Sequence, residues 1–288
     1  MVLMFHREPP MRLLSEAEAF APSGAVVSIG MFDGVHRGHR TVLAQLRARG
    51  DALGLPTVVV TFDPHPRAVV TPNRAPPLLG GLDQRLALLA ATGAADACLV
   101  IRFDRARSAQ SVDAFIEDSL RRRLGMRALV VGENFACGHQ RKGDVAYLTQ
   151  AGVHHGFTVN PVALRQAAEA GSESPCSSTY VRELVSGGDV ELAGAVLGRP
   201  YELAGMVMGM PTANVLSARL PAGICAPAPD DYEGAVAQAG DERWMLAILQ
   251  VRAGVCGVTL HAREAARLAE GSRILLRFTA RRLRAAAA

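Results

Sequence analysis

The chain of 288 residues lacks several features that would each have indicated a class of protein. Its five cysteines include no Cys-x-x-Cys pair, which argues against a disulfide framework and against a zinc site. No apolar stretch is long enough to span a membrane, and the short, soon-charged start is unlike a signal peptide. The net charge of +4 is too mild to indicate nucleic acid as a partner. We therefore expect a cytoplasmic protein with no membrane or nucleic-acid partner.

Two further absences concern the basic residues. Lys142 is the single lysine among the 31 basic residues, and we give this preference for arginine no functional weight. The pattern Gly-x-x-x-x-Gly-Lys-Ser/Thr does not occur, which argues against a P-loop mechanism. The length leaves room for two domains, and a hydrophobic content of 49% with 20% charged residues fits a folded protein with a sizeable core.

Short apolar runs alternate with helical periodicity from Ala25 to about Arg182. Continuous apolar strands separated by helices are typical of an α/β fold, in which helices cover both faces of a parallel sheet. Ligands of such folds bind at the carboxyl ends of the strands. The expected strands are 26–30, 56–62, 97–101, 128–132 and 157–163, and the expected helices are 41–49, 83–92, 111–124 and 144–155.

The composition changes after a helical stretch expected at 179–197. Glycines, prolines and shorter β-like runs follow, and they predict a small, mostly antiparallel β domain. Its expected runs are 202–208, 235–237, 245–251, 255–261 and 272–278. We therefore expect two domains, 1–185 and 186–288.

The most informative segment is Gly30-Met-Phe-Asp-Gly-Val-His-Arg-Gly-His39, directly after the first expected strand. The apolar run breaks at glycines and gives way to helical periodicity at Thr41, which predicts a strand, a tight loop and a helix. His36 and His39 then fall at the start of the helix, within about one turn of each other. Backbone N–H groups and the positive end of the helix dipole favour an anion there, and two imidazoles add directional donors. This segment predicts a phosphate site for nucleotide chemistry.

Two other segments follow expected strands. Thr61-Phe-Asp-Pro-His-Pro66 is a proline-stiffened loop that presents Asp63 and His65, although His65 also suits a purely structural role. The glycine-bounded loop after the fourth strand offers Asn134 as a neutral donor and acceptor, although a turn is the ordinary place for an asparagine.

A hydroxyl-rich segment, Ser177-Ser-Thr-Tyr-Val-Arg182, follows the fifth expected strand. Its hydroxyls precede a helix, and Arg182 lies one turn inside, where its guanidinium can fork onto a phosphate oxygen. Ser177 or Ser178 can equally be an ordinary N-cap. Four polar segments at strand ends of one domain are nevertheless harder to dismiss than any one of them.

Four motifs in this order, GMFDGVHRGH, TFDPHP, VGENFxxGxxxxGD and SSTYVREL, resemble the prokaryotic FAD synthetases, which join an adenylyltransferase to a riboflavin kinase. The resemblance implies a Rossmann-like nucleotidyltransferase domain followed by a small antiparallel β-barrel-like domain. It implies transfer of AMP from ATP to the phosphate of FMN, giving FAD and pyrophosphate, with Mg²⁺ on the phosphates. The implied roles are catalysis by His36, His39 and Arg182, nucleotide binding by Gly30, Phe32, Asp33, Gly38, Ser177, Ser178 and Thr179, and flavin binding by Phe62, Asn134 and Phe135.

Two departures from the family pattern qualify the expected activity. Cys137 stands where the family usually has an aromatic residue that would stack on the flavin. In the kinases of this family a glycine-rich phosphate loop separates the first strand from the element that corresponds to Pro211-Thr-Ala-Asn214. Here only 206–210 lie between them, so the resemblance implies that this loop is missing. Thr212 and Asn214 could still hold magnesium, but we expect that kinase activity is lost.

Two alternatives to FMN adenylyl transfer remain open at this point. The chain could transfer a nucleotide from ATP or CTP to a modified flavin or another phosphorylated acceptor. It could also be a non-catalytic sensor of a flavin or a nucleotide. The intact histidine and serine–arginine segments weigh against the sensor, because a protein that only binds a ligand has little need for two phosphate-binding segments.

Overall fold

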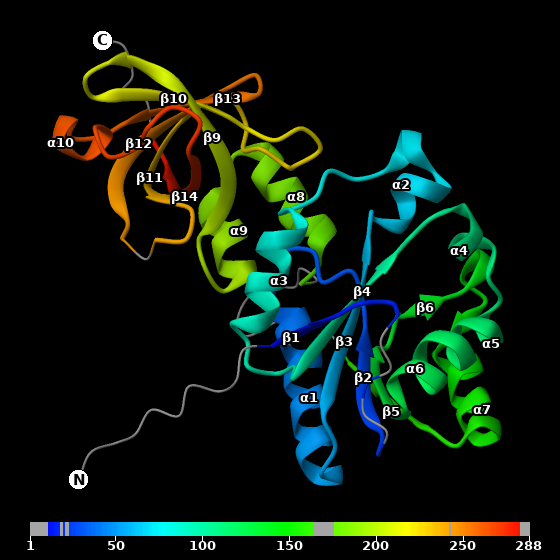
Figure 1. Ribbon diagram of the computed structural model, residues 1–288. Helices are drawn as coiled ribbons and strands as arrows, with labels where there is room; N and C mark the ends of the chain where they lie inside the picture. The colour runs from blue at the N-terminus through cyan, green and yellow to red at the C-terminus, as the bar shows by residue number, and fades with distance from the viewer. Residues whose placement is uncertain (1–10, 18–19, 21–22, 164–175, 242, 283–288) are drawn as a thin grey trace, which may run out of the picture. The chain divides into compact units, whose positions relative to one another are not determined.

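The computed structural model describes residues 11–17, 20, 23–163, 176–241 and 243–282 (Figure 1). The chain forms two compact units, 1–76 with 82–173 and 77–81 with 174–288. The division at 173/174 precedes helix α8 (Ser178–Gly187), whereas the expected boundary at 185/186 falls inside it. Within the described ranges, no helix is both long and apolar enough to cross a membrane.

The first unit is built on a six-stranded sheet whose neighbouring strands are all parallel. Its order is β1 (Arg12–Leu14), β4 (Ala97–Arg102), β3 (Thr57–Asp63), β2 (Ala25–Ile29), β5 (Met126–Gly132) and β8 (Thr158–Val162). The chain moves from β2 to β3 and β4 in one direction, then returns to place β5 on the other side of β2. The carboxyl ends of β2 and β5 therefore flank the topological switch point, where α/β sheets bind ligands. The expected α/β sheet is confirmed.

Helices cover both faces of this sheet (Figure 1). Helices α1 (Arg37–Leu53) and α3 (Leu82–Ala90) pack on the face that holds Val26, through Leu43, Leu46 and Leu89. The opposite face, with Val27, is covered by α5 (Val112–Phe115), the π-helix η2 (Ile116–Arg121), α6 (Arg122–Leu124) and α7 (Val145–His155). The shorter elements are α2 (Pro66–Val70), η1 (Pro72–Arg74), α4 (Arg105–Ala109), β6 (Ala136–Cys137), η3 (His139–Arg141) and β7 (Gly143–Asp144).

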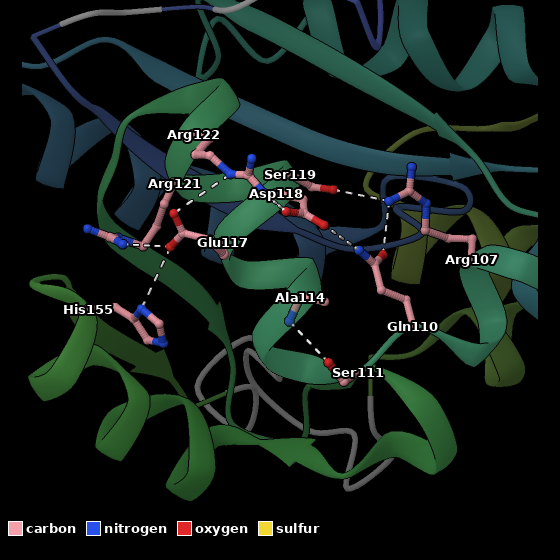
Figure 2. Close-up of polar contacts among 10 residues, drawn as sticks. All are labelled: Arg107, Gln110, Ser111, Ala114, Glu117, Asp118, Ser119, Arg121, Arg122 and His155. Carbon is pink, nitrogen blue, oxygen red and sulfur yellow. Dashed lines mark hydrogen bonds and ion pairs between the residues drawn. The ribbon is translucent and has the colours of Figure 1, made fainter.

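The helix expected at 111–124 is one helical segment with a π-turn in its middle, η2. Ser111 caps its start by accepting a hydrogen bond from Ala114 N at 3.1 Å. Figure 2 shows how basic side chains surround the acidic residues of η2: Glu117 lies 2.6 Å from Arg121 and 3.8 Å from His155. These pairs are partly exposed, so each contributes only a few tenths of a kcal/mol up to about 1 kcal/mol.

The second unit contains a closed barrel in which every neighbouring pair of strands is antiparallel. The barrel order is β10 (Val215–Arg219), β13 (Val255–Thr259), β12 (Met245–Arg252), β11 (Asp231–Gln238), β14 (Arg273–Arg281) and β9 (Tyr201–Thr212), with helix α10 (Ala262–Ala265) after β13. Tyr201, Tyr232 and Phe278 are almost fully buried in its core. The expected β-barrel-like domain is confirmed, although β10 was not among the expected runs.

The helix expected at 179–197 is two helices, α8 and α9 (Val190–Leu197). Gly188 ends α8 with a φ of 85°, a left-handed conformation that suits glycine. Asp189 then caps α9 by accepting a hydrogen bond from Leu192 N at 3.0 Å. The glycine and the cap explain why the chain breaks at this point.

A short segment, 77–81, leaves the first unit and belongs to the second. Leu78 pairs with the chain near the barrel through Leu78 N to Gly223 O and Cys225 N to Leu78 O, both at 2.8 Å. The buried hydroxyl of Tyr201 lies 2.5 Å from the Cys225 carbonyl oxygen and 3.2 Å from that of Leu79, and Leu79 itself is 2% exposed. Residues 77–81 therefore belong to the second unit, and Leu79 is part of its core.

Candidate nucleotide site

The histidine pair lies at the start of α1, immediately after the loop that follows β2. His36 is the N-cap: its Nδ1 accepts a hydrogen bond from His39 N at 3.3 Å. The two rings are stacked, with centroids 3.6 Å apart and planes 19° from parallel. Because Nδ1 accepts, a neutral His36 ring carries its proton on Nε2, where it can serve as a donor. The predicted position of both histidines in the first turn of the helix is confirmed.

The loop before the helix holds two buried residues in an unusual backbone conformation. Phe32 has φ 49° and Val35 has φ 40°, while their exposed fractions are 2% and 0%. A β-branched residue in the left-handed region is costly, so the surrounding packing must hold it there. Strain of this kind concentrates at functional sites, and here it determines the path of the chain into His36.

Gly30 and Phe32 connect the strained loop to the second histidine. A Cβ on Gly30 would lie 3.1 Å from the Phe32 ring, which is tighter than ordinary van der Waals contact. The same ring meets the His39 ring edge-on at 5.3 Å. Gly30 therefore leaves room for Phe32, and Phe32 supports His39. Gly38, another predicted residue, is buried in the first turn of α1.

A buried arginine that the sequence did not single out lies behind the loop. Arg85, on α3, is 3% exposed and donates to Met31 O at 3.2 Å and to Phe62 O at 3.0 Å. Burial lowers the pKa of Arg85, and the negative charges of Asp33 and Asp63 oppose that shift. Asp33 is itself 2% exposed. The sequence did carry one signal for this burial: Arg85 lies four residues before Leu89, on the apolar face of the expected helix.

The predicted flavin residues lie after β3 and β5. Phe62 meets Phe103 edge-on at 5.7 Å and lies 6.3 Å from Phe115, so three aromatic rings gather at the end of β3. Phe135 packs against the same core cluster, whereas Asn134 is exposed. Their role in flavin binding stays a prediction. His65 accepts a hydrogen bond from Arg67 N at 3.0 Å and caps α2, which fits its structural alternative.

Cys137 packs against the core cluster of the first unit and its Sγ lies 3.7 Å from Gly143 O. Burial raises the pKa of its thiol to about 12, and burial has the same effect on Cys98 and Cys256. At pH 8 only about one thiol in 10⁴ is then a reactive thiolate. We expect iodoacetamide to modify these three cysteines only after unfolding, as mapped by peptide mass spectrometry. Rapid labelling of Cys137 in the folded chain would contradict the raised pKa of its thiol.

The hydroxyl-rich segment belongs to the second unit, at the start of α8. Ser177 is the N-cap and accepts a hydrogen bond from Tyr180 N at 3.2 Å. Ser178 and Thr179 follow in the first turn, and Arg182 donates through Nε to Pro77 O at 2.6 Å. The cap confirms the ordinary interpretation of Ser177. A phosphate role for this segment stays a prediction.

The two residues proposed for a vestigial metal site lie at the turn between β9 and β10. Thr212 Oγ1 and Asn214 Oδ1 are 2.9 Å apart and hydrogen-bond each other. β9 is continuous from Tyr201 to Thr212, so the segment 206–210 before Pro211 is strand and holds no phosphate-binding loop. In the described part of the chain, no group of three or more His, Cys, Asp or Glu side chains could hold a metal ion.

Comparisons with known proteins identify a family and several relatives. The sequence model of the FAD synthetase family matches residues 19–179. A bifunctional riboflavin kinase/FMN adenylyltransferase from Pseudomonas fluorescens is 41% identical over 178 residues, which are 62% of this chain and 55% of that protein. The protein of the same name from Escherichia coli K12 is 38% identical with the same coverage. The chain thus matches about half the length of these curated relatives.

A shorter relative and a solved structure extend this picture. A putative bifunctional riboflavin kinase/FMN adenylyltransferase from Geobacillus thermodenitrificans is 38% identical over 177 residues, covering 62% of this chain and 91% of the relative. The crystal structure of a macrolide-efflux protein from Streptococcus pneumoniae aligns with a TM-score of 0.80, covering 96% of this chain and 94% of that one. Its sequence is 18% identical, so this likeness concerns the fold alone. By the match over 19–179 and the identity to these relatives, the chain belongs to the FAD synthetase family.

Proposed function

We propose that the chain transfers AMP from ATP to the phosphate of FMN, producing FAD and pyrophosphate. The observation that carries this proposal is the stacked His36–His39 pair at the N-terminus of α1, beside the switch point of a parallel sheet. Helix N-termini at this edge favour polyphosphates, because N–H groups and the helix dipole both face the anion. The relatives named above are themselves called FMN adenylyltransferases.

In the proposed reaction an FMN phosphate oxygen attacks the α-phosphorus of ATP. A new P–O bond forms there, the bond to the bridging oxygen of the β-phosphate breaks, and pyrophosphate leaves with the electron pair. No protein nucleophile is needed, so the protein contributes position and neutralisation of charge. Donors on His36 and His39 would follow the charge that grows on the α-phosphate and the leaving group. Phe62 and Phe135 would supply apolar surface for the flavin ring.

Magnesium enters this proposal as part of the nucleotide substrate. The acidic side chains nearest the loop, Asp33 and Asp63, both lie in the field of Arg85, and Asp63 is 3.6 Å from it. A carboxylate held by a guanidinium is a poor additional ligand for a cation. These residues do not fit a protein-held metal site, and we infer that Mg²⁺ arrives on ATP.

Product analysis tests this function and its alternatives. The purified chain is incubated with Mg²⁺ and ATP together with FMN, and products are identified by chromatography and mass. We expect FAD and pyrophosphate in equal amounts. With riboflavin in place of FMN we expect neither FMN nor FAD, because β9 is continuous through 206–210 and leaves no phosphate loop before Pro211.

Parallel reactions give the contradicting outcomes. Product formed only with CTP, or only with another phosphorylated acceptor, would favour a different nucleotidyltransferase. Tight binding of ATP and FMN without turnover would favour a sensor. FMN formed from riboflavin would show that the barrel retains kinase activity.

A further inference from the structure

Arg85 carries a charge in a place where charges are expensive. Its side chain is 3% exposed and lies on α3, within the first unit. A guanidinium in a protein interior costs several kcal/mol unless hydrogen bonds and opposite charges offset the loss of water. A leucine or methionine at this position would fill the space without that cost. The partners of Arg85 therefore indicate what the charge is for.

Those partners are the backbone at the ends of two neighbouring strands. Nη1 donates to Met31 O at 3.2 Å, in the loop after β2, and Nη2 donates to Phe62 O at 3.0 Å, near the end of β3. The Thr61 hydroxyl also donates to Met31 O at 3.2 Å. The planar guanidinium thus ties the loop that leads into the histidine pair to the next strand, with one nitrogen for each carbonyl.

Two carboxylates also act on the guanidinium of Arg85. Asp63 Oδ1 lies 3.6 Å from Nη2, and the charge of Asp33 also acts on the guanidinium. Asp33 follows Phe32, whose ring supports His39, and precedes the turn into His36. The hydrogen bond to Met31 and the attraction to Asp33 therefore act on both sides of Phe32, at the start of the strained loop.

We propose that Arg85 is a positioning residue, which holds the 30–35 loop so that His36 and His39 face the triphosphate. This role rests on the proposed adenylyl transfer and adds a residue to it that does not touch substrate. The strained φ values of Phe32 and Val35 require an external restraint, and Arg85 is a buried donor to this loop. A loop displaced by about 1 Å would cost roughly 100-fold in rate.

The test compares three variants of the full chain: Arg85→Ala, Arg85→Lys and, as a matched control, Arg47→Ala. Arg47 is partly buried and ion-paired, 2.9 Å from Asp96, but lies about two turns along α1 from His39 and about three from His36. We expect kcat for FAD formation to fall about 100-fold in Arg85→Ala and to stay near wild type in Arg47→Ala below its unfolding temperature. Arg85→Lys should fold and show a kcat about 10-fold lower than wild type, because one ammonium cannot donate to both carbonyls as the planar guanidinium does.

Chemical rescue separates positioning from general destabilisation. Guanidinium at a few tens of millimolar should raise kcat of Arg85→Ala at least several-fold, whereas the same concentration of urea should not. If Arg85→Ala does not fold, Arg85→Lys alone decides. A kcat of Arg85→Lys equal to wild type would overturn the proposal, and so would equal effects of guanidinium and urea on a folded Arg85→Ala.

A second readout does not depend on catalysis. In ¹⁵N-labelled protein the imidazole signals of His36 and His39 report the geometry of the stacked pair. We expect these signals to move in Arg85→Lys and to remain in place in Arg47→Ala. Unmoved signals in Arg85→Lys would overturn the positioning role. A wild-type chain that forms no FAD would overturn the proposed function instead, so the two failures are distinguishable.

Discussion

Replacing His39 with alanine is expected to lower kcat/KM for FAD formation about 1,000-fold, the usual effect of removing a donor that faces developing charge. The variant also loses the ring that stacks on His36 at 3.6 Å and meets Phe32 edge-on, so His36 loses a restraint as well. The backbone N–H of residue 39 still reaches the His36 cap, which is why α1 should persist. Steady-state rates and far-UV circular dichroism measure the two effects separately.

His154→Ala is the matched control for this experiment. His154 lies exposed in the last turn of α7, in the same unit. The same chemical change at that position should leave kcat/KM within about twofold of wild type, because an exposed substitution rarely changes stability by more than about 0.5 kcal/mol. If His39→Ala and His154→Ala retained equal activity, the histidine pair would have no part in the reaction.

The largest expected effect on stability comes from Gly234→Ala in the barrel. A Cβ on Gly234 would lie 2.1 Å from the Arg277 carbonyl oxygen and 2.8 Å from Leu249 Cδ1. The obstructing atom is backbone of the paired strand β14, next to a register shift at Glu233, so it cannot move without breaking the ladder. We expect the free energy of unfolding of the second unit to fall by about 3 kcal/mol or more.

Urea unfolding followed by tryptophan fluorescence measures this loss. Trp244 is the single tryptophan and stacks on Arg277 at 3.6 Å, so its emission reports on the barrel. Gly187→Ala is the control, because a Cβ there would meet nothing within 4 Å and Gly187 is the last residue of α8, before its cap at Gly188. The control should change stability by no more than about 0.5 kcal/mol. Equal urea midpoints for Gly234→Ala and Gly187→Ala would contradict this prediction and show that β14 can shift to accommodate the added Cβ.

The sequence predicted the position of the two histidines at the start of α1 well, because the relevant signals are local. A buried apolar strand, a glycine-rich turn and an amphipathic helix follow one another within 25–53, and His36 lies at the junction of turn and helix. Cap position and ring proximity then follow from helix geometry, since residues three apart in the first turn are neighbours.

Arg85 could not be predicted in the same way. Its two carbonyl partners are 54 and 23 residues away in sequence, and each is a backbone group that carries no residue-specific signal. The strained conformation of Phe32 and Val35 was also invisible, because neither residue type favours positive φ. The π-helix η2 was equally invisible, because hydrophobic periodicity continues through it. The break after α8 differs, because Gly188 and Asp189 are local signals that the expected single helix did not take into account.

The stretch 77–81 has a consequence for how such a chain can change over generations. Leu79 is buried in the second unit, and its carbonyl oxygen lies 3.2 Å from the Tyr201 hydroxyl. A stop codon after 173 would remove the rest of that unit and leave this apolar side chain exposed. Loss of the barrel in a single genetic step would therefore expose Leu79 unless the upstream loop changed as well. This packing gives a physical reason for a chain to keep a barrel whose strand β9 runs to Thr212 without the phosphate loop of a kinase.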